Sequence, residues 1–261
     1  MTVRGLKKSY GSKVAVDGVS FEIGKSEVFA ILGPNGAGKT TTLKCVLGLR
    51  HPDGGEVRFT GSFSYLPEEK NLYPYLRVKD TVDLFERIGK NFKREKAISS
   101  LEKYGIDPKL KVSELSHGMK TLTYLSLVLA EDVDLYVLDE PTWGLDPLAR
   151  SDVLNALRSL TYEGKSVLYT SHILSEVEKV ADRILIMKAG KVIIQGYLDD
   201  VKASYKLVVS ERELDGYLLK RTKKELIYLV RVDRIPEGVE VRDASFEEIF
   251  EAIVRGERDV A

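Results

Sequence analysis

A glycine-rich segment, GPNGAGKT at residues 33–40, follows the apolar run EVFAIL and opens a segment with a helical pattern. The spacing G-x-x-x-x-G-K-T is typical of a phosphate-binding P-loop, whose glycines let successive backbone N–H groups point at one anion. The helix expected to begin at Lys39 adds its positive end. A glycine-rich turn with a chance lysine is the alternative, but the strand–loop–helix context disfavours it. The residues predicted to bind nucleotide here are Gly33, Pro34, Asn35, Gly36, Ala37, Gly38, Lys39, Thr40 and Thr41.

Within this loop two side chains have chemistry of their own. Lys39 is expected to reach the terminal phosphates, which gives it a catalytic as well as a binding role. Thr40 is expected to offer its hydroxyl to Mg²⁺. The sequence therefore predicts ATP and Mg²⁺ as the cofactors of this chain.

Two adjacent acids, Asp139 and Glu140, end the apolar segment DLYVLDEP at residues 134–141. If that strand lies beside the P-loop, Asp139 is placed near Mg²⁺, and Glu140 can polarise a water for in-line attack on the γ-phosphate. Without the P-loop, the two acids would more simply be a solvated strand end. With it, we interpret Asp139 as a metal ligand and Glu140 as the catalytic base.

His172 lies in YTSHIL, residues 169–174, where another buried-type strand ends in polar residues. It could hydrogen-bond the γ-phosphate or hold the attacking water, a catalytic role. A single histidine after a strand is more often a turn residue, so this prediction depends on the other motifs.

The octet ELSHGMKT, residues 114–121, contains no nucleophile or metal-binding pattern. Ser116 stands where a helix N-cap is expected, and Gly118 falls in the first turn of a long apolar-striped segment. A helix N-terminus with one hydroxyl and one glycine is suited to an anion. The octet alone does not identify the anion.

Strand-like and helix-like segments alternate along most of the chain, which predicts an α/β core with a mainly parallel sheet. Residues 78–130 are mostly helical in pattern and are expected to form an insertion. After about residue 205 the pattern becomes β-rich and ends in a helix that Ser245 and Glu248 open as a capping box. The expected strands are 14–23, 27–32, 56–59, 63–67, 134–141 and 166–170, with a hairpin at 183–196 and further helices at 147–160 and 174–181.

Composition excludes some classes of protein. Forty Lys+Arg balance forty Asp+Glu, so the formal charge is zero and no basic field indicates nucleic acid as a partner. A single cysteine, Cys45, is expected to be a small core residue and favours a reducing compartment. No signal-peptide pattern is visible at the start, and the longest apolar run, residues 121–130, is shorter than the ~20 residues that span a bilayer. A membrane role is therefore expected only through a partner.

Taken in order, the motifs resemble one family, the nucleotide-binding subunits of ABC transporters, over roughly residues 3–200. The resemblance is closest to stand-alone ATPases that drive exporters of drugs, ions, lipids or glycans. It implies a P-loop NTPase-type α/β fold with a mainly parallel sheet, an antiparallel β part, a helical insertion and a small C-terminal α+β appendix. We therefore divide the chain into an ATP-binding domain, 1–205, and an accessory domain, 206–261. The motifs are Tyr10, GPNGAGKT, YLPEE, ELSHGM, LYVLDEP, WGLD and SHIL.

The resemblance also implies roles and partners. Tyr10 would stack on adenine, and Ser116 and Gly118 would contact the γ-phosphate of ATP bound to a second ATP-binding subunit, identical or different. Two chains would then close head to tail on two ATP molecules, hydrolyse them and reopen. The subunit would lie peripherally on the cytoplasmic side of the cell membrane and drive an integral membrane permease, with no nucleic acid as partner.

Three residues depart from the family pattern. Met119 replaces the last residue of the usual LSGGQ motif and cannot donate a hydrogen bond. Glu68 replaces the usual glutamine after Pro67; we predict it as a third metal ligand, beside Thr40 and Asp139. Trp143 replaces a small polar residue and is either an interface anchor or a cap on the adjacent core.

Two other functions remain as alternatives. A soluble ABC-type ATPase acting on a ribosome or nucleic acid would usually have two such domains or long coiled-coil arms. A GTPase or kinase would leave Ser116, Gly118 and the WGLD segment at 143–146 unexplained.

Overall fold

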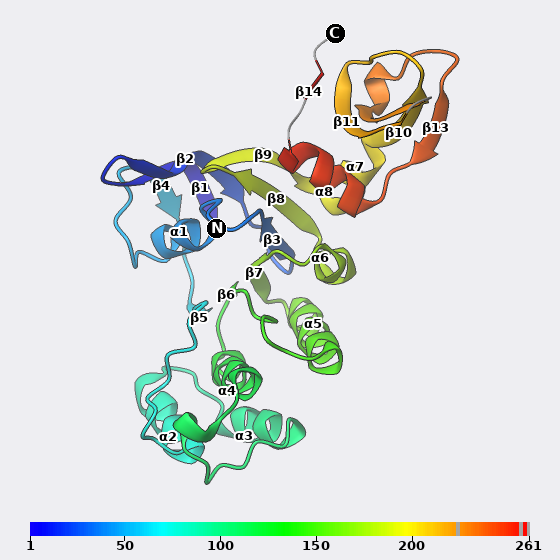
Figure 1. Cartoon of the computed structure of the whole chain (residues 1–261). Helices are drawn as coiled ribbons and strands as arrows, with labels where there is room; N and C mark the ends of the chain where they lie inside the picture. Colours follow the sequence, from blue (N-terminus) through cyan, green and yellow to red (C-terminus); the bar gives the residue numbers. More distant parts are fainter. Residues whose placement is uncertain (223–224, 256–257, 260–261) are drawn as a thin grey trace.

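The computed structural model describes residues 1–222, 225–255 and 258–259 (Figure 1). A six-stranded sheet in the order β5-β6-β7-β3-β8-β9 forms its centre. The first five strands run parallel, and β9 pairs antiparallel with β8. The strands are β3 Val28–Leu32, β5 Phe63–Leu66, β6 Leu135–Asp139, β7 Ser166–Ser171, β8 Arg183–Lys188 and β9 Lys191–Tyr197. The expected α/β fold with a mainly parallel sheet is confirmed.

The sequences of the central strands explain their position. Every residue of β3, β6 and β7 is buried, as expected for parallel strands covered on both faces. The β8–β9 hairpin, which the sequence predicts at 183–196, turns at Ala189 and Gly190, both with positive φ (48° and 80°).

A three-stranded antiparallel sheet, order β2-β1-β4, packs against one side of this centre. Its strands are β1 Thr2–Tyr10, β2 Lys13–Glu22 and β4 Gly54–Arg58. The tight turn between β1 and β2 pairs Tyr10 with Lys13. A hydrogen bond from Asp17 N to Gly190 O, 2.8 Å, ties β2 to the β8–β9 turn. These contacts fix Tyr10 relative to the central sheet.

Helices cover the central sheet and extend away from it. The helices beside the sheet are α1 Lys39–Val46, α5 Pro147–Tyr162, α6 Leu174–Val180 and α7 Leu198–Ala203. Three others, with a 3₁₀ turn, gather at one end of the molecule (Figure 1). They occupy the segment for which the sequence predicts a helical insertion: α2 Val78–Ile88, α3 Arg94–Lys103, η1 Val112–Glu114 and α4 His117–Leu129.

The C-terminal part contains a five-stranded antiparallel sheet at the opposite end of the molecule (Figure 1). Helix α8 begins at the predicted capping box: Ser245 N–H donates to Glu248 Oε2 (2.8 Å) and Glu248 N–H donates to Ser245 Oγ (3.2 Å). The elements are β10 Tyr205–Ser210, β11 Gly216–Arg221, β12 Leu226–Arg231, η2 Val232–Arg234, β13 Glu240–Asp243, α8 Phe246–Arg255 and β14 Arg258–Asp259.

One side of this C-terminal part shares a hydrophobic core with the rest of the chain, whereas a second buried cluster belongs to the terminal sheet alone: Val208, Leu226, Tyr228 and Val230. Val177 of α6 belongs to the same buried cluster as Leu207 and Leu229 of the terminal sheet and Phe246 and Ile249 of α8. The apolar face of α8 is therefore buried partly against the helix that follows His172. The packing continues across residue 205. The division into an ATP-binding domain, 1–205, and an accessory domain, 206–261, therefore stays a proposal.

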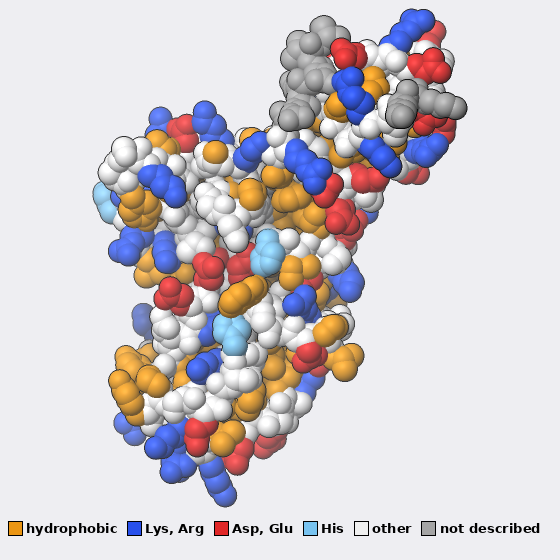
Figure 2. Space-filling view, viewed as in Figure 1, with side chains coloured by type: hydrophobic (Ala, Val, Ile, Leu, Met, Phe, Trp, Pro, Cys, Tyr) orange, Lys and Arg blue, Asp and Glu red, His pale blue; other side chains and the backbone are white. Residues whose placement is uncertain are grey.

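None of the helices in the described part of the chain is both long and apolar enough to cross a membrane. On the face seen in Figure 2, positive and negative side chains are interspersed over the central part, the helical end and the C-terminal end of the molecule.

Candidate nucleotide-binding site

The site lies where neighbouring parallel strands end at one edge of the central sheet. Gly33 directly follows β3, Glu140 follows β6, His172 follows β7, and Glu68 comes shortly after β5. The strand order places β5, β6, β7 and β3 side by side, so these four residues gather at the carboxyl edge, where ligands bind in open α/β sheets.

The glycine-rich loop has the backbone that its sequence predicts. Gly38 is left-handed, with φ of 105°, and a Cβ there would lie 2.3 Å from Ala15 O, so only glycine fits. Ala37 N–H donates to Pro34 O (3.1 Å), which closes the loop. Within the described structure α1 has no side-chain N-cap, which leaves N–H groups of its first turn available to a ligand.

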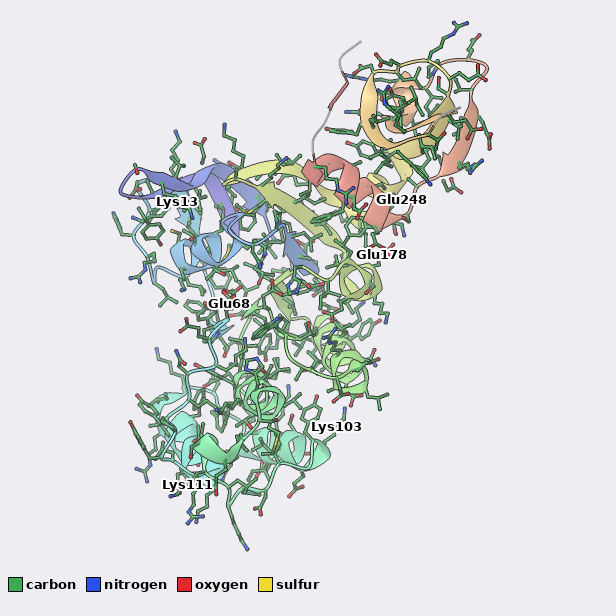
Figure 3. All side chains as sticks on the ribbon, in the orientation of Figure 1. Lys13, Glu68, Lys103, Lys111, Glu178 and Glu248 are labelled. Atoms are coloured by element: carbon green, nitrogen blue, oxygen red, sulfur yellow. The ribbon has the colours of Figure 1, made fainter. Side chains whose placement is uncertain are left out.

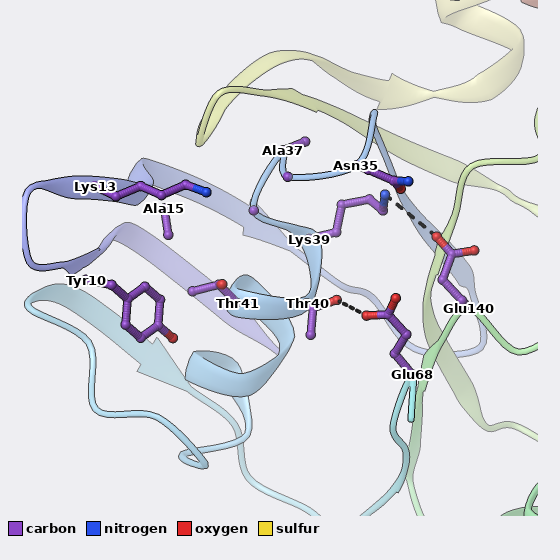
Figure 4. Close-up of a pocket in the computed structure, with 12 residues that line it drawn as sticks. Tyr10, Lys13, Ala15, Asn35, Ala37, Lys39, Thr40, Thr41, Glu68 and Glu140 are labelled. Atoms are coloured by element: carbon purple, nitrogen blue, oxygen red, sulfur yellow. Dashed lines mark hydrogen bonds and ion pairs between the residues drawn. The ribbon is translucent and has the colours of Figure 1, made fainter. Parts of the chain in front are cut away.

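A cavity of about 330 Å³ opens over this loop (Figure 4). Tyr10 and Lys13 lie on one side of it, and Glu68 and Glu140 lie on the other. The cavity is lined by Tyr10, Lys13, Ala15, Asn35, Gly36, Ala37, Gly38, Lys39, Thr40, Thr41, Glu68 and Glu140. Most of the predicted nucleotide-binding residues therefore share one cavity, and Tyr10 stands where a base could stack.

Lys39 is buried and oriented by two oxygen groups. Its Nζ donates to Gly33 O at 2.8 Å and lies 3.7 Å from Glu140 Oε1. The ammonium group thus bridges the loop and the acid at the end of β6. A cation held here can meet phosphate oxygens placed above the loop.

Asp139 is fully buried, and its two carboxylate oxygens differ. Oδ1 accepts from Thr170 Oγ1 (2.5 Å), whereas Oδ2 is buried with no hydrogen-bond partner among the described residues. Burial raises the pKa of the Asp139 carboxyl. On the cavity wall, Thr40 Oγ1 donates to Glu68 Oε2 at 3.2 Å. The structure brings hydroxyl and carboxylate oxygens together here, and leaves one buried oxygen without a partner.

Glu140 is held in an uncommon backbone conformation, with φ of 48°. Its N–H donates to Thr170 Oγ1 (3.0 Å), and its Oε2 lies 2.9 Å from His172 Nδ1. Its side chain is nearly buried, while that of His172 is 42% exposed. Such a conformation persists only where several contacts fix it, and here they orient the carboxylate toward Lys39 and His172.

Ser116 and Gly118 lie outside the cavity. Ser116 caps α4 as predicted, accepting from Met119 N–H at 3.2 Å, and the side chain is exposed. A Cβ on Gly118 would lie 3.1 Å from Gly144 O, so this helix tip packs closely on the loop after β6. The structure therefore separates these two residues from the P-loop of the same chain.

Trp143 packs on the same helix tip. Its ring stands edge-on to the His117 ring at 4.7 Å between centroids, and Trp143 remains 52% exposed. Gly144 has φ of 79°, and a Cβ there would lie 2.3 Å from His117 Cδ2. Because Trp143 covers an exposed histidine, the interpretation as a cap on the buried core is disfavoured.

Three polar residues of the site are not among those predicted from the sequence. Lys13 lines the cavity beside Tyr10, and Thr170 bonds both Asp139 and the Glu140 backbone. Lys70 donates to Pro67 O (2.6 Å) and Asp139 O (3.0 Å), and burial lowers the pKa of its ammonium to about 8. The hairpin turn after Tyr10 could have suggested Lys13; Lys70 and Thr170 have no comparable local pattern.

Comparisons with known proteins agree with this geometry. The family model for ABC transporters matches residues 16–143. The Nod factor export ATP-binding protein I of Burkholderia orbicola (strain AU 1054) is 40% identical over 210 residues, which cover 74% of this chain and 69% of that protein. The protein of the same name from Rhizobium etli is 36% identical over 213 residues, covering 75% of this chain and 67% of its own length.

Solved structures show the same fold. An ATP-binding subunit of an ABC transporter superposes with a TM-score of 0.70 at 28% identity, covering 77% of this chain and 91% of that one. A dimeric ATP-binding cassette in a post-hydrolysis state, bound to ADP and Pi, gives a TM-score of 0.69 at 23% identity, with 76% and 98% covered. The family expected from the ordered motifs is confirmed: this chain belongs to the ATP-binding subunits of ABC transporters and is an ATPase.

Proposed function

We propose that this chain binds Mg·ATP in the 330 Å³ cavity, hydrolyses it, and thereby drives an exporter. The observation that carries the proposal is the convergence of the P-loop, Glu68, Asp139 and Glu140 at one sheet edge. Export as the direction is supported by the relatives named Nod factor export ATP-binding proteins. The transported substrate would be recognised by another polypeptide.

In this proposal the main residues in and beside the cavity have separate tasks. The loop amides and Lys39 bind phosphate oxygens, Tyr10 stacks on adenine, and Glu140 takes the proton of the attacking water. His172, hydrogen-bonded to Glu140, holds the water or the γ-phosphate. Lys39 Nζ and Glu140 Oε1 are 3.7 Å apart, a distance that supports the proposal that both groups act on the same terminal phosphate.

The residues also fit a magnesium ion. Mg²⁺ prefers hard oxygen ligands and is usually bound by one or two carboxylates together with phosphates. The unpartnered Oδ2 of Asp139, the Thr40 hydroxyl and the Glu68 carboxylate are such oxygens. When bound, the ion would neutralise phosphate charge.

A second ATP-binding subunit, identical or different, would complete each site. Ser116 and Gly118 lie outside the cavity of their own chain, at the exposed start of α4. That helix tip offers a hydroxyl, backbone N–H groups and a positive dipole end to an anion on another subunit.

Magnesium-dependent binding is the first expected result. Titrating the purified chain with a non-hydrolysable ATP analogue in a calorimeter should give saturable heat with Mg²⁺ and weaker binding in excess chelator. Asp139→Asn should lower the magnesium-dependent affinity about 10- to 100-fold, because it removes a buried charged ligand.

The matched control is Asp152→Asn, which changes an exposed aspartate paired with Lys103 away from the cavity. Its binding should equal that of the unmodified chain. Equal magnesium dependence in Asp139→Asn would contradict the ligand assignment, and no binding by the unmodified chain would contradict the function.

The second expected result concerns the membrane partner. Tyr73 and Tyr75, just before α2, are 60% and 80% exposed, and we propose that they belong to the surface that meets a permease. A tagged chain purified from detergent-solubilised native membranes should bring along an integral multi-helix protein. The pair of substitutions Tyr73→Ser and Tyr75→Ser should reduce its recovery.

Tyr162→Ser is the control, because Tyr162 is 79% exposed but lies on α5. This variant should recover the membrane protein fully. Copurification of ribosomes or nucleic acid in place of a membrane protein would favour the soluble ABC-type ATPase. If Tyr162→Ser reduced recovery of the membrane protein as much as the Tyr73 and Tyr75 substitutions do, the assignment of Tyr73 and Tyr75 to the docking surface would be wrong.

A further inference from the structure

Helix α6 buries a carboxylate that the site described above does not use. Glu176 lies four residues after His172 and is only 4% exposed. Its Oε2 accepts from Thr142 Oγ1 at 2.5 Å, whereas Oε1 has no hydrogen-bond partner among the described residues. Arg150 Nη1 lies 3.7 Å from that second oxygen. A buried acid is costly unless it is paired, so its position on α6 calls for a reason beyond packing.

The partner of Glu176 belongs to the loop that carries Glu140. Thr142, 1% exposed, comes two residues after Glu140. Further along the same loop, Leu145 O accepts from Arg150 Nε at 2.8 Å. The loop 140–146 is thus fastened at Thr142 by Glu176 and at Leu145 by Arg150.

The segment from His172 to Glu176 therefore touches this loop twice. His172 Nδ1 lies 2.9 Å from the Glu140 carboxylate, and Glu176 holds Thr142. Contacts at positions 140 and 142 fix the orientation of this part of the loop as well as its position. The left-handed backbone of Glu140 needs such support, because an uncommon φ persists only where neighbours fix it.

We propose that Glu176 is a positioning residue for ATP hydrolysis: through Thr142 it fixes the loop 140–146 against the His172 segment and so aims the Glu140 carboxylate. The proposal rests on the proposed function, which makes Glu140 the base. Glu176 does not line the cavity, and its effect should therefore fall on turnover and leave nucleotide binding intact.

The chemistry of the contact makes the conservative variant informative. Thr142 donates and Glu176 accepts, so a glutamine at 176 can still accept through its amide oxygen, whereas a leucine cannot. Burial raises the pKa of Glu176, and the Thr142 hydroxyl and Arg150 act against this rise. Hydrogen-bond acceptance, which glutamine keeps, is the feature that the proposal requires.

The test compares Glu176→Leu, Glu176→Gln and Thr142→Val in the full chain. Glu176→Leu and Thr142→Val should each lower kcat about 10- to 100-fold, because a small misplacement of a catalytic group has an effect of this size. KM and the affinity for the ATP analogue should stay unchanged. Glu176→Gln should keep kcat within about threefold of the unmodified chain, since acceptance is retained.

The matched control is Glu178→Leu on the same helix (Figure 3), an acid that pairs with Lys202 and does not touch the loop. It should leave kcat unchanged. If Glu176→Leu does not fold, Thr142→Val, which keeps the side-chain shape, carries the test. Unchanged kcat in folded Thr142→Val, or an equal loss of kcat in Glu178→Leu, would overturn the proposal.

Failure of the proposed function would give a different result. In that case the unmodified chain would show no hydrolysis, or Glu140→Gln would hydrolyse ATP normally. Hydrolysis that depends on Glu140 but is indifferent to Glu176 and Thr142 would reject only the positioning role.

Discussion

Glu140→Gln should lower kcat for ATP hydrolysis by a factor of about 10²–10⁴, the usual contribution of a general base, while ATP still binds. The substitution preserves the shape of a side chain that is only 7% exposed, so the local packing should remain. It removes the proton acceptor, and it also removes a negative charge 3.7 Å from Lys39, which relieves repulsion with the phosphates. The variant should therefore accumulate as an ATP-bound dimer.

Steady-state phosphate release measures the first effect, and size-exclusion chromatography with Mg·ATP measures the second. Glu163→Gln, an exposed glutamate beyond the end of α5, is the control and should behave as the unmodified chain. If Glu140→Gln turns over at the unmodified rate, another group is the base. If it binds no ATP, Glu140 has a structural role in place of a chemical one.

Ser116→Arg should abolish turnover through a different step. Ser116 is exposed at the start of α4 and lies outside the cavity of its own chain. A long side chain there should prevent the helix tip from closing on a neighbouring subunit, while the affinity of the isolated chain for ATP stays intact. Combined with Glu140→Gln, it should remove the ATP-dependent dimer.

Two controls separate bulk from the loss of the helix cap. Ser116→Ala loses the bond to Met119 N–H, at a cost of about 0.5–2 kcal/mol in stability, but adds no bulk. Ser113→Arg adds the same bulk at another exposed position, in η1. Dimerisation should persist in both. A persistent dimer in Ser116→Arg would refute the role of Ser116 across the subunit interface.

The parts of the site that sequence predicts are those encoded locally. The P-loop needs glycines at fixed spacing, Ser116 needs a helix directly after it, and Asp139 and Glu140 end an apolar strand. Each of these signals lies within a few neighbouring residues, so the place of each residue in its strand, loop or helix can be predicted from the local sequence. The main sheet follows for the same reason, because alternating strand and helix patterns leave few topologies.

The missed parts depend on register and packing. Thr170 stands within an apolar strand, and only the pairing of β6 with β7 sets it opposite Asp139. Glu176 and Thr142 are 34 positions apart, so no local pattern shows that they are in contact. Phe246 and Ile249 reveal an apolar face of α8, but no local pattern shows that α6 is among the elements that cover it.

The shared apolar cluster of α6 and α8 has a consequence for communication over distance. Because α6, the helix that follows His172, packs into the same core as α8 and the terminal sheet, a change in packing at one end of this core can reach the other through direct contacts. The fluorescence of a dye attached to an exposed position of β13 should then change when ATP binds or is hydrolysed. Conversely, a molecule that binds the terminal sheet should change the rate of ATP hydrolysis.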